Sequence, residues 1–260
     1  MESKKGEHRK LKAVLVFIAY FFGGIVDSVC GGCGLITLPV LFAIGLPAHT
    51  AVGTNQVSML PGIATSVVKF YKSDKIDIKN AIYAVPFGVI GGFAGAKLNL
   101  LVSEWYLQIL LLILIPVLTV FSILKPNVGS EDRSAENTKK KTILLSAAIG
   151  LIVGTYHSFY GPASGTFFML AFSAFLKYDL VTANGNTRFV TMFVSIISTI
   201  TYALSGCAKW FYVLLAVPGY ALGNYVGASL AISKGAKFVR PMYYIILVLL
   251  FCKLVKDLLL

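Results

Sequence analysis

The feature that most constrains this chain is a series of long apolar segments that carry no charge. The clearest, residues 107–124, is apolar on every side of a helix, so an amphipathic surface helix does not account for it. Soluble domains have about 25% charged residues, whereas this chain has 13%, with 57% hydrophobic residues. Because about 20 apolar residues in a helix cross a bilayer, the sequence predicts an all-α integral membrane protein.

Eight segments have the length of transmembrane helices. We expect spans at residues 11–29, 49–70, 80–100, 105–124, 142–159, 181–205, 210–232 and 238–255. Two further apolar pieces, 35–44 and 166–176, are too short to cross a bilayer as helices. We expect these two pieces to be half-helices or re-entrant segments.

The two halves of the chain resemble one another. AVPFGVIGGFAGAKL (84–98) aligns without a gap with AVPGYALGNYVGASL (216–230), and the same shift of 132 aligns HTAVGTNQ (49–56) with VTANGNTR (181–188). A shift of 130 pairs Gly24 and Gly31 with Gly154 and Gly161. We expect two tandem four-helix repeats, and transporters built from repeats place their solute site where the repeats meet. The predicted units are an N-terminal basic segment (1–12), a first membrane repeat (13–124), a polar linker (125–141) and a second membrane repeat (142–260).

The net charge of +12 comes from short groups of Lys and Arg between the apolar segments. This pattern is typical of membrane topology signals and not of a nucleic-acid-binding face, so we expect no nucleic acid partner. Eight spans with a cytoplasmic N-terminus put 17 Lys and Arg inside and five outside, with Arg188 within a span. If the short pieces crossed fully, the repeats would be inverted and the split would be about 13 to nine. The larger asymmetry favours eight spans in a bacterial inner membrane, with segment 1–12 and the linker in the cytoplasm.

Each short piece follows a glycine-rich break, GGIVDSVCGGCGLITLP (23–39) and GTYHSFYGPASGTFFML (154–170). Glycine allows the backbone to bend, and a half-helix that starts in the break points its free N–H groups and positive dipole end at the gap. Such a helix start binds anions, although close packing of small residues is the alternative. The candidate solute-binding residues here are Gly31, Gly32 and Gly34 in the first break and Gly161, Ser164 and Gly165 in the second.

Polar residues follow each short piece at the start of a long span. The further candidate solute-binding residues are Thr54, Asn55 and Gln56 in the first repeat and Asn184, Asn186, Thr187 and Arg188 in the second. Amides must be satisfied inside a bilayer, so they either bond neighbouring helices or line a hydrated path. A cation such as Arg188 costs about 3 kcal/mol to insert. Its guanidinium matches oxyanions; the alternative is that it reaches out to the interface.

Asp27 and His157 occupy equivalent positions just before the two breaks. An acid and an imidazole that meet near the centre would relay protons coupled to solute movement; the alternative is a structural hydrogen-bonded pair. Cys30 and Cys33 spell CGGC, so an intramembrane thiol enzyme is one rival function. A non-transporting membrane scaffold is another. No nucleotide-binding, metal or catalytic motif accompanies them, so we expect no cofactor, no metal and no enzyme activity.

The first repeat reads G-x-x-x-[DS]-x-x-x-G-G-x-G-L-I-T-L-P, then GLPAHTAVGTNQ and IDIKNAIYAVPFGVIGGFAGAKL, and resembles the TauE/SafE sulfite exporter family. The resemblance covers nearly the whole chain, and Pro39, Ala51, Gly53, Thr54, Gly91 and Gly95 fit its pattern. Cys33 stands where glycine is usual, and the second copy carries GPASG. The resemblance implies secondary transport, often export, of sulfite, sulfonates or other small sulfur-containing or carboxylate anions.

Overall fold

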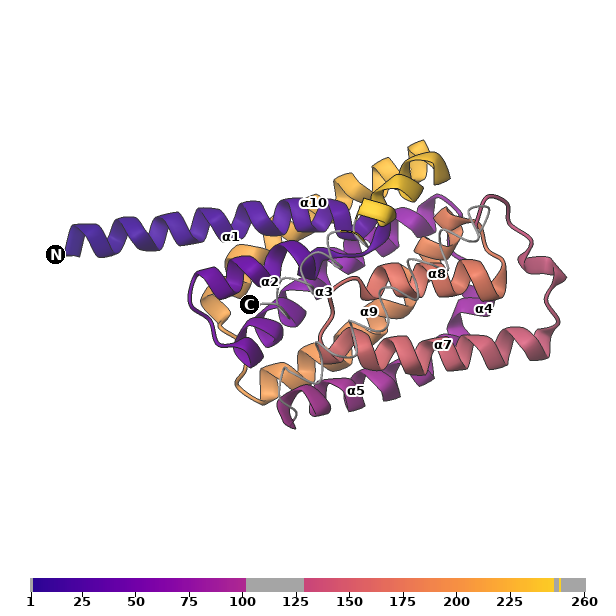
Figure 1. Cartoon of the computed structure of the whole chain (residues 1–260), viewed down its shortest axis with the longest axis horizontal. Coiled ribbons are helices and arrows are strands. Elements are labelled where there is room, and N and C mark those ends of the chain that lie inside the picture. The colour runs from indigo at the N-terminus through magenta and orange to yellow at the C-terminus, as the bar shows by residue number, and fades with distance from the viewer. Residues whose placement is uncertain (1, 102–128, 246–247, 249–260) are drawn as a thin grey trace.

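The computed structural model describes residues 2–101, 129–245 and 248, which form helices and loops without any strand (Figure 1). The first half contains α1 (Glu2–Cys30), α2 (Cys33–Ala43), α3 (Ala48–Lys72), α4 (Ile78–Ala81), η1 (Ile82–Ala84) and α5 (Val85–Leu101). The second contains η2 (Ser134–Glu136), α7 (Lys139–Phe159), α8 (Ser164–Leu176), α9 (Leu180–Leu204) and α10 (Trp210–Lys234), and residues 236–245 are also helical. A long, a short and two further long helices therefore follow one another in each half.

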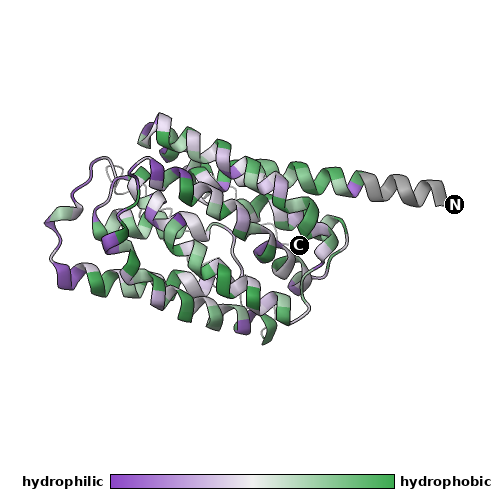
Figure 2. Cartoon of the chain, turned by 180° about the vertical axis from the view of Figure 1, so that it is seen from behind, coloured by the Kyte–Doolittle hydropathy of each residue, from purple (hydrophilic) through white to green (hydrophobic). Residues whose placement is uncertain are grey.

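Five of the described helical stretches are long and apolar enough to cross a membrane: Leu11–Cys30, Ile78–Leu101, Lys139–Phe159, Leu180–Leu204 and Trp210–Lys234. Hydrophobic residues follow the bodies of the helices (Figure 2), and many are exposed as lipid-facing residues would be, including Ile152 (68%) and Leu214 (72%). The prediction of an all-α chain with membrane-spanning helices is confirmed for this part of the chain. Expected span 105–124 and half of 238–255 lie outside the described residues, so the number eight stays a prediction.

The two short helices double back along the helices before them. Gly31 and Gly32 adopt φ values of 78° and 138° in the first break, and Gly161 has a φ of 99° in the second; glycine takes such values without strain. Lys12 Nζ donates to Ile44 O at 3.0 Å, so the end of α2 returns to the level where α1 enters the bundle. Asn137 Nδ2 likewise donates to Leu176 O at 2.8 Å, which brings the end of α8 back to the start of α7.

The first long helix of each half packs against the third long helix of the other half. α1 lies along α10 and α7 along α5, while α3 packs on α10, α9 on α5, and α3 and α9 on each other. Glycines bring these backbones close: a Cβ at Gly223 would lie 2.1 Å from Phe21 O, and one at Gly95 would lie 2.0 Å from Thr155 O. Small residues at helix interfaces favour close packing in membranes, so the two halves are interlocked.

Neighbouring glycines also reveal the helix directions. Gly219, Gly223 and Gly227 face Phe17, Phe21 and Ile25 in that order, so α1 and α10 are parallel. By the same criterion α3 is parallel to α10, and α7 and α9 are both parallel to α5. α3 and α9, however, are antiparallel, because Lys75 just after α3 faces Gly185 near the start of α9.

The helices of the second half therefore run opposite to their counterparts in the first. This is the inverted arrangement expected if α2 and α8 return the chain across the bundle, and the described helices do not fit two repeats in the same direction. The start of α1 and the loop before α7 lie at opposite ends of the bundle (Figure 1). Segment 1–12 and the linker thus lie at opposite ends of the bundle, and the cytoplasmic side predicted for each stays a prediction.

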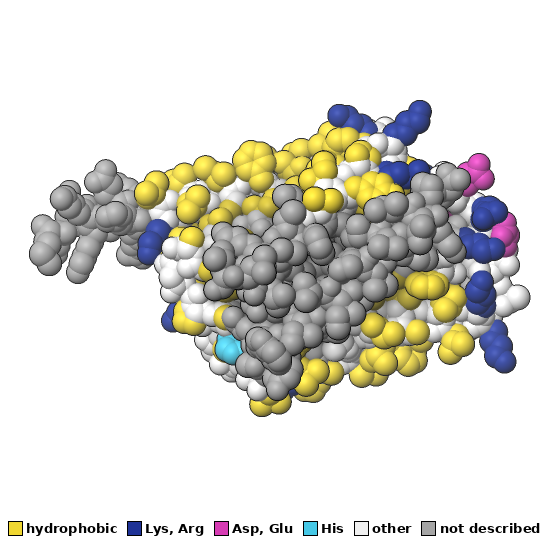
Figure 3. Space-filling model, viewed as in Figure 1, with side chains coloured by type: hydrophobic (Ala, Val, Ile, Leu, Met, Phe, Trp, Pro, Cys, Tyr) yellow, Lys and Arg dark blue, Asp and Glu magenta, His cyan; other side chains and the backbone are white. Residues whose placement is uncertain are grey.

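We call the end of the bundle formed by residues 73–77, 129–138 and 177–179 the linker face, and the end formed by residues 44–47 and 205–209 the opposite face. Lys and Arg side chains gather at the linker face (Figure 3). The two breaks lie between these faces, in the interior of the bundle.

Candidate functional site

The two breaks meet inside the protein. Thr166 Oγ1, in the first turn of α8, donates to Cys30 O at 2.7 Å and to Gly31 O at 2.9 Å. Gly31 is so close to Gly165 and Thr166 that an added Cβ would lie 2.3 Å from Thr166 N. Gly34 packs on Pro162 in the same way, with 3.1 Å between an added Cβ and Pro162 Cα. The starts of both short helices thus lie side by side, each contributed by a different half of the chain.

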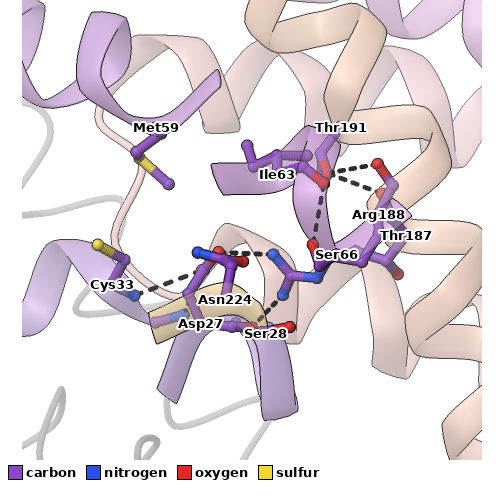
Figure 4. A network of polar contacts seen from close by, with 12 residues as sticks. Asp27, Ser28, Cys33, Met59, Ile63, Ser66, Thr187, Arg188, Thr191 and Asn224 are labelled. Carbon is purple, nitrogen blue, oxygen red and sulfur yellow. Dashed lines mark hydrogen bonds and ion pairs between the residues drawn. The ribbon is translucent and has the colours of Figure 1, made fainter. Parts of the chain in front are cut away.

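Arg188 does not reach the surface but is 2% exposed and bonded to Asp27 (Figure 4). Its Nη1 lies 2.6 Å from Asp27 Oδ2, its Nη2 donates to Asp27 O, and its Nε donates to Asn184 Oδ1 at 3.3 Å. The alternative that Arg188 extends to the interface does not hold in this structure. The pair joins α9 of one half to α1 of the other at the break.

The Asp27 carboxylate occupies the start of α2. Oδ1 accepts from Gly32 N at 3.2 Å and Cys33 N at 3.5 Å, and Oδ2 also accepts from Tyr220 OH at 2.5 Å. Two backbone N–H groups, a phenol and a guanidinium therefore surround one carboxylate. This is the set of donors expected of an anion site, and the chain's own acid fills it.

His157 lies in a separate network and does not bond Asp27. Its Nδ1 lies 2.7 Å from Ser164 Oγ and its Nε2 lies 3.2 Å from Ser195 Oγ. The sequence argument missed Ser195 and Tyr220, which lie within otherwise apolar segments. The repeat contains a signal for Tyr220, since this polar aromatic residue stands opposite Gly88 in the alignment of 84–98 with 216–230.

Equivalent residues of the two halves make equivalent bonds across the interface. Gln56 Nε2 donates to His157 O at 2.5 Å, as Arg188 donates to Asp27 O. The first-half and second-half polar patches also receive backbone bonds from the other half.

Those backbone bonds lie near the two ends of the bundle. Lys209 N donates to Thr54 Oγ1 at 3.0 Å near the opposite face, and Asp77 N donates to Asn186 Oδ1 at 2.8 Å near the linker face. We call these two bonds the Thr54 latch and the Asn186 latch. They tie helices together in this structure.

The remaining predicted residues also bond to protein atoms. Asn55 Oδ1 accepts from Tyr20 OH and Thr37 Oγ1, Asn184 Nδ2 donates to Ser28 O and Val29 O, and Thr187 Oγ1 donates within its own helix. Several buried polar atoms nevertheless have no partner among the described residues, among them Ser28 Oγ, Gln56 Oε1 and Asn224 Oδ1 near the break and Asn186 Nδ2 toward the linker face. Unsatisfied groups are costly in a bilayer, so their presence is unusual for a purely structural core.

The cysteines of the break are packed thiols. Cys30 and Cys33 are free and buried, and Cys33 Sγ lies 3.6 Å from Thr37 Oγ1. Within the described ranges, no group of three His, Cys, Asp or Glu side chains is placed to hold a metal ion.

Comparison with known proteins identifies the family. The model of the family described as "Sulfite exporter TauE/SafE" matches residues 16–254. The chain belongs to the TauE/SafE family. This TauE/SafE protein is 30% identical to the "Probable membrane transporter protein YfcA" of Escherichia coli K12 over 95% of its own length and 90% of that protein.

Other relatives of this TauE/SafE protein carry similar descriptions. It is 28% identical to the "Probable membrane transporter protein ORF9" of Sinorhizobium over 93% of its length and 92% of the relative, and 24% identical to "Probable membrane transporter protein YdhB" of Bacillus subtilis over 88% and 96%. No solved structure matches it. The family and these relatives identify a bacterial type of membrane transporter, and they leave the solute open.

Proposed function

We propose that this TauE/SafE protein is a secondary transporter that exports small oxyanions across the inner membrane, with sulfite, an organosulfonate or a related sulfur-containing or carboxylate anion as its solute. The observation that carries the proposal is the buried guanidinium of Arg188 at the point where two interrupted helices meet. A cation at this depth is costly and is typical of a solute or ion pathway.

The surroundings of Asp27 suggest how an oxyanion binds. The donors that now bond its carboxylate, namely Arg188, Tyr220 and the N–H groups of Gly32 and Cys33, are those an oxyanion would need. In the proposed cycle the solute takes the place of the carboxylate, and Asp27 is protonated so that no unpaired buried charge remains. Asp27 and, in the equivalent position, His157 are thus the proposed proton-coupling residues.

The rest of the proposed pathway follows the two breaks and the two polar patches. It consists of Gly31, Gly34, Thr54, Asn55 and Gln56 from the first half, and Gly161, Ser164, Gly165, Asn184, Asn186 and Thr187 from the second. Inverted repeats commonly alternate access by rocking one repeat against the other around a central site. We propose that the Thr54 latch opens for one side and the Asn186 latch for the other. With both latches formed, the structure corresponds to an occluded state.

Flux measurements with purified protein test this function. Proteoliposomes are loaded in turn with sulfite, a small sulfonate and a small carboxylate, and efflux is followed with and without a pH gradient. We expect at least one of these anions to leave faster than from protein-free vesicles, at a rate that depends on the pH gradient. A cooperative thermal unfolding transition shows that the reconstituted protein is folded. If folded protein transports none of these anions, and none of them raises its Tm, the proposal is disproved.

A further inference from the structure

A polar cavity lies at the linker face, away from the two breaks. It has a volume of about 370 Å³ and is lined by α4, η1, η2 and the start of α7, with Lys79, Tyr83, Ser134, Asn137, Lys139 and Thr142 among its residues. Asp77, whose backbone N–H forms the Asn186 latch, also lines the cavity, and none of the other lining residues belongs to the proposed solute pathway. The cavity therefore calls for a different ligand.

The charge of the cavity favours an anion. Lys79 and Lys139 are exposed at its edge, and among the described residues neither has a carboxylate partner. The acid in the wall, Asp77, is engaged because its Oδ2 accepts from Tyr178 OH and Asn80 Nδ2, both at 2.7 Å. α7 also begins here, and its positive dipole end adds to the field of the lysines.

Glu136 in η2, the neighbouring acid, also has a partner. Glu136 accepts from Lys177 Nζ at 2.6 Å, and this bond lowers the pKa of the Glu136 carboxyl. It thus stays with Lys177 and does not neutralise the lysines of the cavity.

The cavity lies at the boundary between the lipid-facing belt and the charged end of the protein. Ile78, Ile82 and Leu144, which flank its lining residues on the same helices, are 38%, 42% and 68% exposed. Exposed apolar residues directly beside a basic pocket place the pocket at the depth of lipid headgroups, where basic pockets bind anionic lipids. This position favours a lipid over a solute that arrives from water.

We propose that this cavity is a binding site for an anionic phospholipid, in which Lys79 and Lys139 bind the phosphate of the headgroup. The inference does not depend on the identity of the transported solute. It assigns to the linker face a lipid site beside the Asn186 latch.

Lipid binding to the purified full chain tests the proposal. Delipidated protein is titrated with phosphatidylglycerol, phosphatidic acid, phosphatidylcholine and water-soluble glycerol phosphate, and bound lipid is counted by native mass spectrometry. We expect phosphatidylglycerol and phosphatidic acid to bind more tightly than phosphatidylcholine, and Lys79→Gln and Lys139→Gln each to weaken phosphatidylglycerol binding about fivefold, as a lysine near anionic lipid contributes.

The matched control is Lys140→Gln, which removes an exposed lysine next to the cavity but not in its lining. It should bind phosphatidylglycerol like the unchanged protein. Equal loss in Lys140→Gln would mean that diffuse surface charge binds the lipid, and unchanged binding in both cavity variants would remove the site. If glycerol phosphate displaced the lipid at equal concentration, the ligand would be a soluble phosphoester and the lipid assignment would be overturned.

Discussion

Replacing Arg188 by glutamine, the residue in the equivalent position of the first half, removes the cation and leaves Asp27 in place. The variant loses the 2.6 Å bond from Nη1 to Asp27 Oδ2 and the bond to Asp27 O. Asp27, 3% exposed, keeps only Tyr220 and the two backbone donors. Removal of one partner from a buried ion pair costs about 3–5 kcal/mol. At about 2–4 °C per kcal/mol for chains of this size, we expect Arg188→Gln to lower the Tm by about 6–20 °C.

Adding Asp27→Asn to Arg188→Gln removes both charges and separates the structural role from transport. A double-mutant cycle measures the coupling between the two side chains, and we expect the double variant to regain most of the lost stability. It should still fail to move anions in proteoliposomes, because the guanidinium is absent. A double variant as unstable as Arg188→Gln would refute the charge argument, and one that transports normally would remove Arg188 from the anion site.

Three further predictions concern helix contacts, the latches and the thiols. Gly185→Ala should destabilise the protein by about 1–3 kcal/mol in thermal unfolding, the usual cost of overpacking, because its Cβ would lie 1.8 Å from Lys75 O; Ser229→Ala, at an exposed site on α10, should not. Asn186→Ala should make Cys33 reactive toward an impermeant thiol reagent added at the linker face. Thr54→Ala should make Cys33 reactive toward the same reagent added at the opposite face. Reactivity from the same face in both variants would contradict separate latches. Cys33→Ala should keep anion flux, whereas complete loss would favour the thiol-enzyme alternative.

The sequence predicted the helical class and the position of both breaks, because apolar length and glycine spacing are local properties. It did not predict the partner of Asp27. Asp27 and His157 occupy equivalent positions in the two repeats, and the sequence argument therefore expected them to meet. In the structure each of them is instead bonded by a residue from a long helix of the other half. The partners Arg188 and Gln56 follow from the packing of α3 and α9 and not from the alignment.

Helix direction was also beyond the sequence. The two short helices were correctly separated from the long ones by length, but length alone does not tell whether such a helix returns the chain to the face from which it came. The bond between Lys12 and Ile44 shows that return for α2. Charge asymmetry favoured eight spans, but a count of Lys and Arg does not contain the direction in which a short helix runs.

The ion pair of Arg188 and Asp27 has no charged counterpart in the first half, where Gln56 bonds the carbonyl of His157. If each half adopted the conformation of the other during a transport cycle, the protein would open to the other side of the membrane. The neutral contact of Gln56 would then stand where the ionic contact of Arg188 had been. The two orientations would then differ in energy. Such a protein would rest in the orientation of lower free energy. An ion gradient that drives transport would have to supply the free-energy difference between the two orientations in every cycle.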